Sequence, residues 1–405
     1  MSKPEQRRAL IIGGSMSGLF TATLLARAGW HAEIYERAES ELTGRGAGIV
    51  THAPMRAVLA AAGCDPSRDL GIAVDSRKVL DRSGAVIAHR RCPQTLTSWD
   101  RVFRLLRESF PAERYHLGKE LRRIEPSAEQ VMAQFADGST AQAALLVGAD
   151  GFRSTVRAQL LPEVKPVYAG YVAWRGLVAE SALSASTHAD LFDALVFSLP
   201  AGEQCLTYPV AGPDNDLRPG HRRCNFVWYR PARGAELERM LTDAHGHLHA
   251  LGIPPPLVRP DIITELRSAA RALLPPQLDE VVQLTARPFL QPIYDVETTR
   301  MVVGRVALVG DAAFLARPHV AAGVTKAAED ALALATALQS GGPFEAALAA
   351  FETVRVGINR RVIQRGRDLG SYLAPQSASG DARRRAAQHG TPEAVLREIA
   401  VLDFR

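Results

Sequence analysis

The first 36 residues show an apolar run, a glycine-rich turn, a helical pattern and a second apolar run. Residues 9–12 are all apolar and lead into the turn Gly13-Gly14-Ser15-Met16-Ser17-Gly18. Residues 19–28 then place small and apolar side chains on one helix face, and a β-type run at residues 34–35 ends at Glu36. This order predicts a strand, a tight turn, a helix and a second, parallel strand.

A second pattern of the same kind lies in residues 304–331. Residues 306–309 form a short apolar run that stops at Gly310-Asp311, and apolar side chains recur with helical spacing after Gly323. We expect a buried strand, an acidic turn and a helix that begins near Gly323. The free N–H groups at such a helix start favour an electron-rich group.

The chain between and after these patterns has a different arrangement of apolar and polar residues. Residues 72–92 predict a hairpin or edge strands around Ser83-Gly84, and residues 131–147 predict a hairpin with its turn at Asp137-Gly138. From Pro166 on, short aromatic and β-branched runs separated by Pro, Gly and Asp are typical of an antiparallel sheet. A helix is expected around residues 262–274, a strand over 281–293, a solvated connection over 374–392 and a last helix near 392–402.

The predicted fold is therefore α/β. A Rossmann-like domain is interrupted by a mostly antiparallel β-sheet domain and is followed by a C-terminal helical segment. We assign residues 1–72, 93–165 and 285–365 to the Rossmann-like domain, 73–92 and 166–284 to the sheet domain, and 366–405 to the C-terminal segment.

Composition narrows the class of protein. Of 405 residues, 47% are hydrophobic and 22% charged, as in soluble globular proteins, and no apolar run is long enough to span a membrane. The N-terminus lacks the apolar core of a signal peptide, so we expect a cytoplasmic protein that binds neither membrane nor nucleic acid. The spacing of Cys64, Cys92, Cys205 and Cys224 argues against disulfides and against a zinc or other metal site. Whether the protein forms a homodimer is left open by the sequence.

The first pattern carries the fingerprint of a dinucleotide-binding site. The glycines of residues 13–18 allow a tight turn, the following helix offers its N-terminus to a pyrophosphate, and Glu36 offers a carboxylate to a ribose hydroxyl. Ser15 stands where the strict pattern has its middle glycine. A second glycine-rich stretch, residues 44–49, is expected to pass close to the same ligand.

Three motifs resemble the signatures of one family in order and spacing. GGSMSG with Glu36, GADGFRSTVR at residues 148–157, and GRVALVGDAAF with RPHVAAG from residue 304 resemble class A flavoprotein monooxygenases, aromatic hydroxylases of the p-hydroxybenzoate hydroxylase type. The resemblance covers most of the chain. It implies that the protein binds FAD non-covalently and that NADH or NADPH reduces this FAD. The reduced flavin would react with O2 to give a flavin hydroperoxide, which hydroxylates a small aromatic substrate.

The resemblance implies a hydroxylated pyridine or similar N-heteroaromatic as the substrate. A phenol, a purine or a natural-product ring is an alternative with the same chemistry. A flavin-fold reductase or ligand-binding protein without hydroxylase activity is an alternative of another class.

The family also implies roles for individual residues. Asp150 and Arg157 would serve transient nicotinamide binding, and the position that often holds an FAD-binding arginine is Phe103 here, which leaves Arg45, Arg101 and Arg104 as candidates. The expected cofactor-binding residues are Gly13, Gly14, Ser15, Met16, Ser17, Gly18, Glu36, Arg37, Arg45, Gly48, Asp150, Gly310, Asp311, Gly323, Val324 and Thr325.

Catalytic and substrate residues follow from position alone. A histidine near the flavin edge could help to deprotonate a ring hydroxyl, and His319 and His52 both qualify. A lone histidine is more often a packed or solvated residue. Trp174, Tyr208 and Trp228 are expected either to wall the substrate pocket or to belong to the core of the sheet.

Overall fold

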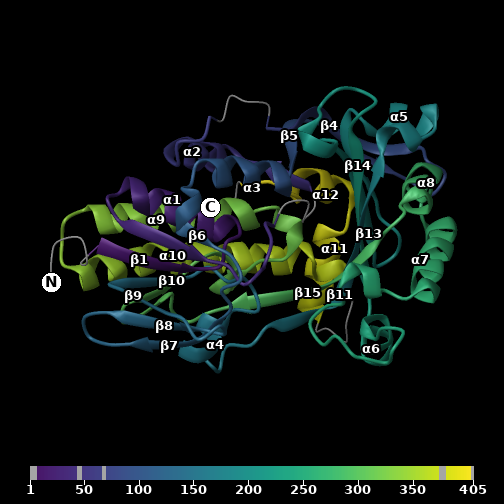
Figure 1. The fold of residues 1–405 in the computed structure, drawn as a ribbon. Coiled ribbons are helices and arrows are strands. Elements are labelled where there is room, and N and C mark those ends of the chain that lie inside the picture. The colour runs from purple at the N-terminus through teal and green to yellow at the C-terminus, as the bar shows by residue number, and fades with distance from the viewer. Residues whose placement is uncertain (1–6, 43–47, 66–69, 374–379, 403–405) are drawn as a thin grey trace.

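A computed structural model describes residues 7–42, 48–65, 70–373 and 380–402. One lobe is built on a mostly parallel sheet with helices beside it, and the other on a large twisted sheet that runs into the first (Figure 1). Within the described residues, no helix is long and apolar enough to cross a membrane.

A six-stranded sheet forms the centre of the first lobe. Its strands β1, β2, β6, β10 and β17 pair in parallel, and β16 pairs antiparallel to β17 at one edge. In spatial order the strands are β16 (Val302–Val303), β17 (Val306–Leu308), β10 (Leu145–Gly148), β1 (Arg8–Ile12), β2 (His31–Tyr35) and β6 (Tyr115–His116).

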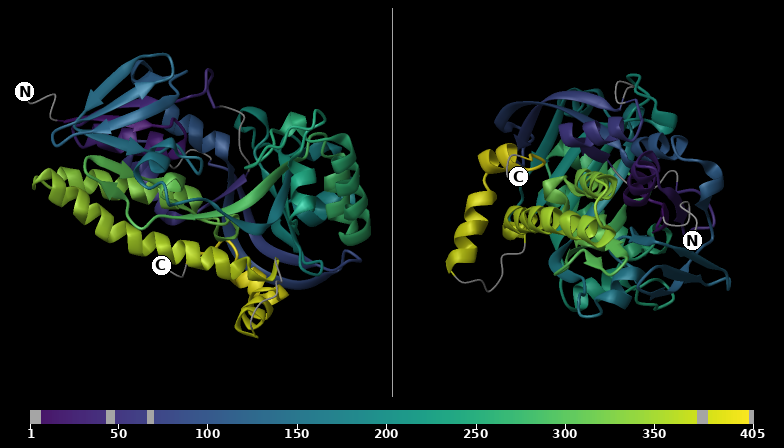
Figure 2. Two further views of the ribbon diagram at one scale, coloured as in Figure 1. Left: turned by 90° about the horizontal axis from the view of Figure 1, so that it is seen from below. Right: turned by 90° about the vertical axis from the view of Figure 1, so that its left-hand side faces the viewer.

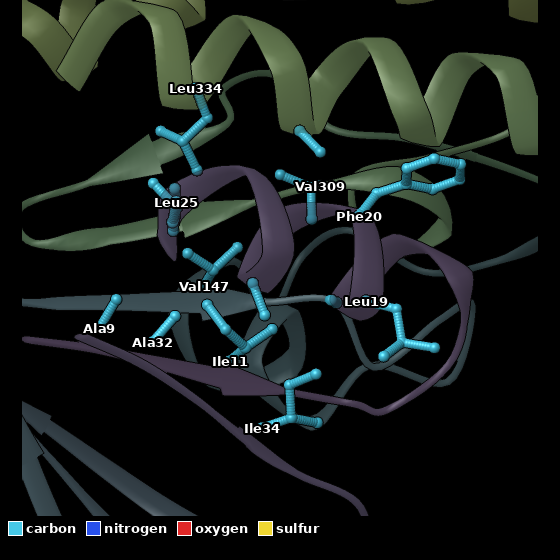
Figure 3. Close-up of a cluster of buried hydrophobic side chains, with 14 of the residues drawn as sticks. Ala9, Ile11, Leu19, Phe20, Leu25, Ala32, Ile34, Val147, Val309 and Leu334 are labelled. Atoms are coloured by element: carbon cyan, nitrogen blue, oxygen red, sulfur yellow. The ribbon is translucent and has the colours of Figure 1, made fainter. Parts of the chain in front are cut away.

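Helix α1 (Met16–Arg27) packs between this sheet and helix α9 (Gly323–Gln339). Its side chains Leu19 and Leu25 lie among residues from the strands on one side and Leu334 of α9 on the other (Figure 3). The other helices and strands of this lobe are α2 (Ala53–Ala61), α3 (Trp99–Glu108), α4 (Thr155–Leu160), α10 (Phe344–Leu369), β7 (Leu121–Pro126), β8 (Val131–Phe135) and β9 (Thr140–Ala143).

A nine-stranded sheet forms the second lobe and extends under the first. It is antiparallel except for the parallel pair of β12 and β4. In spatial order the strands are β18 (Phe314–Leu315), β15 (Phe289–Glu297), β11 (Val167–Ala179), β14 (Arg223–Pro231), β13 (Gln204–Val210), β12 (Ala194–Ser198), β4 (Ile72–Leu80), β5 (Val86–Ser98) and β3 (Gly48–Thr51).

Both faces of the nine-stranded sheet are covered, which explains the consecutive apolar residues in its strands. One face packs against residues of α5 (Ala185–Leu191), α6 (Ala235–Leu241), α7 (Pro260–Leu273) and α8 (Pro276–Leu284). The other packs against α10, the loop around Val320 and the C-terminal helix α12 (Pro392–Glu398). Figure 2 shows the C-terminal helices, in yellow, beside the end of α10.

The α/β fold with its antiparallel sheet and C-terminal helices is confirmed, as are both hairpins. Two predicted elements are wrong. Residues 281–284 are helical because α8 begins at the Pro275-Pro276 step and buries Leu278, Val281 and Val282 on one face, so the strand starts only at Phe289. Helix α11 (Gly380–His389) occupies most of the expected solvated connection, whose residues 374–379 lie outside the described part.

Candidate functional site

Three parallel strands of the first lobe end side by side. Because Ile12 pairs with Gly148 and Gly148 with Leu308, the residues that follow these strands meet at one edge of the sheet. They surround a cavity of about 710 Å³. The predicted cofactor residues that line it are Gly13, Ser15, Ser17, Glu36, Arg37, Asp150 and Asp311.

The glycine-rich turn is tightly enclosed beneath this cavity. Gly13 has φ +105, and a Cβ there would lie 2.5 Å from the carbonyl oxygen of Ala149. A Cβ on Gly14 would overlap the Tyr115 hydroxyl, and one on Gly18 would overlap the Gly13 carbonyl. Met16 is buried in the core behind the turn. The turn therefore brings bare backbone to the cavity wall.

The start of helix α1 is left open to a ligand. Ser15 stands at its N-cap position, and its hydroxyl makes no capping hydrogen bond. The first N–H groups of the helix and its positive dipole end thus stay available to an anion such as a pyrophosphate.

Glu36 ties the end of β2 to the glycine-rich turn. Its carboxylate accepts hydrogen bonds from the Gly14 N–H at 2.7 Å and the Ala38 N–H at 2.9 Å. The Tyr115 hydroxyl donates to the Gly14 carbonyl at 2.8 Å from the other side. Glu36 is 7% exposed and lines the cavity, so its carboxylate can take a further hydrogen bond from a ligand.

Asp150 and Arg157 both make structural contacts around the loop that follows β10. The Asp150 carboxylate caps α4 by accepting from the Ser154 hydroxyl at 2.5 Å and the Thr155 N–H at 2.7 Å, and burial raises the pKa of Asp150. Arg157 is 3% exposed and donates to the carbonyls of Ala312 and Phe152. It thereby joins the two loops that follow β10 and β17.

The turn after β17 rests on a buried ionic network. The Gly310 N–H donates to Asp330 at 3.0 Å, and Asp330 also accepts from Arg355 at 2.7 Å. Gly310 has φ +59. Burial raises the pKa of the neighbouring Asp311, and the Lys326 cation opposes that rise. The network holds Asp311 between the first cavity and a second one of about 390 Å³.

Sequence reasoning missed several residues that line the first cavity, among them Arg153, Trp99 and Lys119. Arg153 belongs to the GADGFRSTVR motif and could have been found there, whereas Trp99 and Lys119 carry no local signal. Among the candidate FAD arginines, Arg104 lies 2.8 Å from Asp100, and Arg101 lies on the same helix, α3. The candidate Arg45 lies outside the described residues.

A third cavity, of about 180 Å³, lies between the nine-stranded sheet and the start of α9. It adjoins the 390 Å³ cavity at Pro318, and that cavity adjoins the largest at Asp311 and Arg153. The three form one series from the strand ends to the sheet. The smallest is lined by Gly48, Ile49, Val50, Arg175, Leu195, Leu206, Tyr208, Val227, Tyr229, Pro318, His319, Ala321, Gly323, Val324, Ile399 and Ala400.

His319 is the histidine that lines the smallest cavity. It is 2% exposed, its Nε2 lies 2.9 Å from the Tyr171 hydroxyl, and its Nδ1 has no hydrogen-bond partner among the described residues. Burial, with Arg317 and Arg175 nearby, lowers the pKa of His319 to about 3. The imidazole is therefore uncharged at neutral pH.

His52 supports the loop that carries His319. Its Nε2 donates to the carbonyl of Ala321 at 3.2 Å, and Ala321 adopts a left-handed backbone with φ +49. Gly323 and Val324 follow at the start of α9 and line the cavity, while Thr325 is buried. The two candidate histidines thus belong to one loop system, with His319 at the cavity.

The tryptophans and Tyr208 lie on opposite faces of the large sheet. Side chains alternate along a strand, and Arg175, Val227 and Tyr229 line the cavity. Trp174 and Trp228 consequently point the other way, into the core formed with α5 to α8. Tyr208 lines the cavity, beneath Gly48.

The arrangement fits FAD. A bare glycine turn, an uncapped helix start and a carboxylate suit the adenosine diphosphate part, and cavities that share lining residues follow one another from the strand ends to the sheet. The first turn of α9 presents its free N–H groups where a flat ring would meet Gly323 and Val324.

Comparison with known proteins decides the family. A family model described as FAD binding domain-like matches residues 168–295. The chain is 32% identical over 376 residues to 2,6-dihydroxypyridine 3-monooxygenase of Paenarthrobacter nicotinovorans, with 91% of this chain and 92% of the relative covered. The chain belongs to the class A flavoprotein monooxygenases. It is thus an FAD-dependent aromatic hydroxylase that takes its electrons from NADH or NADPH, as predicted.

A solved structure and a second relative agree with this assignment. The crystal structure of 2,6-dihydroxypyridine-3-hydroxylase from Arthrobacter nicotinovorans matches with a TM-score of 0.86 at 30% identity, covering 92% of this chain and 94% of that one. The 3-amino-4-hydroxybenzoate 2-monooxygenase of Streptomyces cremeus is 31% identical, with 96% of this chain and 94% of the relative covered. Both likenesses run over nearly the whole length of the monooxygenase.

Proposed function

We propose that this monooxygenase hydroxylates a hydroxylated pyridine or a similar N-heteroaromatic with a single ring. The observation that carries the proposal is the 180 Å³ cavity beside His319. A cavity of about 150 Å³ is enough to hold benzene, so a six-membered ring with small substituents fits. Both curated relatives described above are named for single-ring substrates, one of them a dihydroxypyridine.

Different residues of the chain bind different parts of the cofactor. In the proposal, the turn of residues 13–18 and the α1 start hold the pyrophosphate, Glu36 the adenosine ribose, and Asp311 the ribityl chain. Gly323 to Thr325 face the flavin ring and stabilise negative charge on it. Bound FAD supplies the activated oxygen when it is reduced by the nicotinamide and meets O2.

His319 is proposed to handle a proton of the substrate. With its proton on Nε2, toward Tyr171, the neutral imidazole leaves Nδ1 to accept from a ring hydroxyl. Withdrawal of that proton makes the ring richer in electrons and more reactive toward an electrophilic oxygen. A low pKa makes His319 a weak base in the free protein, and the charge of a bound, ionised ring would raise it.

Apolar walls protect the reaction from water. Leu195, Leu206, Val227 and Ile399 line the same cavity as His319. Exclusion of water prevents the activated oxygen from being lost as hydrogen peroxide. Because the reaction consumes reduced nicotinamide, the proposal places the enzyme in the cytoplasm.

The test is a panel of rings given to the purified, FAD-loaded protein. Hydroxypyridines, phenols and purines are compared by the NADH or NADPH they cause to be consumed and by the mass of the product. A dihydroxypyridine should give fast consumption and a product with one added oxygen, and purines should give neither. Preferred hydroxylation of a purine or of a phenol would overturn the substrate assignment, and consumption that no ring stimulates would point to a reductase.

A further inference from the structure

One cation in the smallest cavity has no counter-charge. Arg175 lies on β11, lines the cavity, and its Nε is buried without a hydrogen-bond partner. No carboxylate of the described residues lies within ion-pair distance of its guanidinium. A half-buried cation among apolar side chains is costly unless a partner or a ligand compensates it.

Three other arginines of the same lobe are paired with carboxylates, whereas the completely buried Arg77 donates to backbone carbonyls. Arg317, on the loop with His319, lies 2.9 Å from Asp295, and Arg222 and Arg230 contact Glu180 and Glu203 respectively. The fold thus supplies carboxylates to arginines elsewhere in this sheet. Arg175 has neither a carboxylate nor a carbonyl partner among the described residues, which indicates that its charge is kept for a partner from outside the chain.

We propose that Arg175 binds a negatively charged oxygen of the substrate, so that the ring is taken up as an anion. The oxygen can belong to an ionised ring hydroxyl or to a ring carboxylate, since both accept hydrogen bonds from a guanidinium. The inference rests on the proposed function, because it names the class of ring that the same cavity accepts. With Arg175 holding one oxygen and His319 facing another, the two residues also orient the ring.

The groups around Arg175 keep one charge state over a wide pH range. Burial lowers the pKa of His319 to about 3, raises that of Tyr229 to about 12, and raises the pKa of Tyr208, Tyr171 and Tyr372 further. Arg317 stays charged beside Asp295. Between roughly pH 5 and 10 these groups do not titrate, so a change in binding that follows the pKa of the ligand reports the ionisation of the ligand.

The experiment measures dissociation constants from the change in flavin absorbance when rings bind to the FAD-loaded protein. The probes are matched pairs: 2,6-dihydroxypyridine with its di-O-methyl ether, and a pyridine carboxylate with its carboxamide, each ionisable ring above and below its own pKa. The variants are Arg175→Gln and Arg175→Lys. Arg230→Gln is the control, because Arg230 follows Tyr229 on the opposite face of the same sheet and pairs with Glu203.

Wild-type protein should bind each ring more tightly once the ring is ionised. Arg175→Gln should weaken binding of the anion about ten- to a hundredfold and that of the neutral partner less than about threefold. Arg175→Lys should recover part of the loss, and Arg230→Gln should change neither. The two pairs distinguish hydroxyl anions from carboxylates, and a loss in either pair supports the proposal.

Equal weakening of charged and neutral rings in Arg175→Gln would overturn the inference, as would an unchanged preference for the anion. FAD content, measured for every variant, excludes misfolding as the cause. If wild type hydroxylates a pyridine while Arg175→Gln keeps the preference, the Arg175 proposal alone fails. If anions depend on Arg175 but no ring is hydroxylated, the proposed function alone fails. If no ring binds wild type at all, both fail.

Discussion

Replacement of Arg77 by methionine should loosen the C-terminal segment that closes the substrate cavity. Arg77 lies on β4 and is completely buried. Its guanidinium donates to the carbonyls of Leu396 at 3.1 Å, Ile399 at 2.5 Å and Ala400 at 3.3 Å. Ile399 and Ala400 line the cavity, and the Ala400 N–H donates to the carbonyl of His319. Arg77 therefore fixes the position of Ile399 and Ala400, which line the substrate cavity.

The magnitude follows from the bonds that are lost. Hydrogen bonds from a charged donor contribute about 1.5–3 kcal/mol each, so three carbonyl bonds correspond to about 4.5–9 kcal/mol before the cost of burial. Burial of a cation costs several kcal/mol, and it lowers the pKa of Arg77 here. A net loss of about 2–4 kcal/mol remains, which raises the open population of the segment roughly thirty- to several-hundredfold.

Hydrogen exchange at residues 392–400 and hydrogen peroxide formed per NADH consumed are the two assays. Both should rise in Arg77→Met, since a loosened wall admits water. Arg82→Met is the matched control, because Arg82 on the same hairpin also donates to two carbonyls, those of Arg271 and Ala272, away from the cavity. Exchange at residues 392–400 that is equal in Arg77→Met and Arg82→Met would refute the reasoning.

Three further predictions concern the cofactor and His319. Glu36→Ala should lower the affinity for FAD about ten- to a hundredfold, because a charge-assisted pair of about 1.5–3 kcal/mol is lost; unchanged affinity in a flavin titration would remove Glu36 from the ribose site. Acid precipitation should release all the yellow colour into solution, since the flavin is expected to be held without a covalent bond; colour in the pellet would contradict this. His319 has a folded pKa of about 3 and an unfolded value of about 6.5, so the unfolded state takes up a proton first as pH falls. From pH 7.5 to 5, urea unfolding should show wild type losing about 2 kcal/mol more stability than His319→Gln, and parallel losses would mean that His319 is not buried as a neutral ring.

The cofactor lobe could be predicted because its signals are local. The turn of residues 13–18, the strand before it and Glu36 lie within one βαβ unit, so their spacing along the chain reports their spacing in space. Gly310-Asp311 is recognisable for the same reason. Val281 and Val282 show the limit of such reasoning, since their β propensity is overridden by a proline-started helix whose buried face includes them.

The substrate cavity was harder to predict because its walls come from distant segments. Tyr229, Arg175, His319 and Ala400 meet only after the sheet is formed and the C-terminal segment has docked. Alternation along β11 could have shown that Trp174 and Arg175 face opposite ways, but not which face is the cavity. Arg77 contacts residues more than 300 positions away, and no local pattern reveals such a contact.

The most direct test of the proposed function is the fate of labelled oxygen in wild type and His319→Gln. Each FAD-loaded protein is given NADH or NADPH, a dihydroxypyridine and ¹⁸O₂, and the labelled product is measured against the nicotinamide consumed. Wild type should place one labelled atom in the ring for most of the nicotinamide oxidised. His319→Gln should keep its FAD and its reduction by nicotinamide but release more of the oxygen as hydrogen peroxide. The same product ratio in both proteins would show that His319 does not act on the ring, and absence of label from the wild-type product would contradict ring hydroxylation itself.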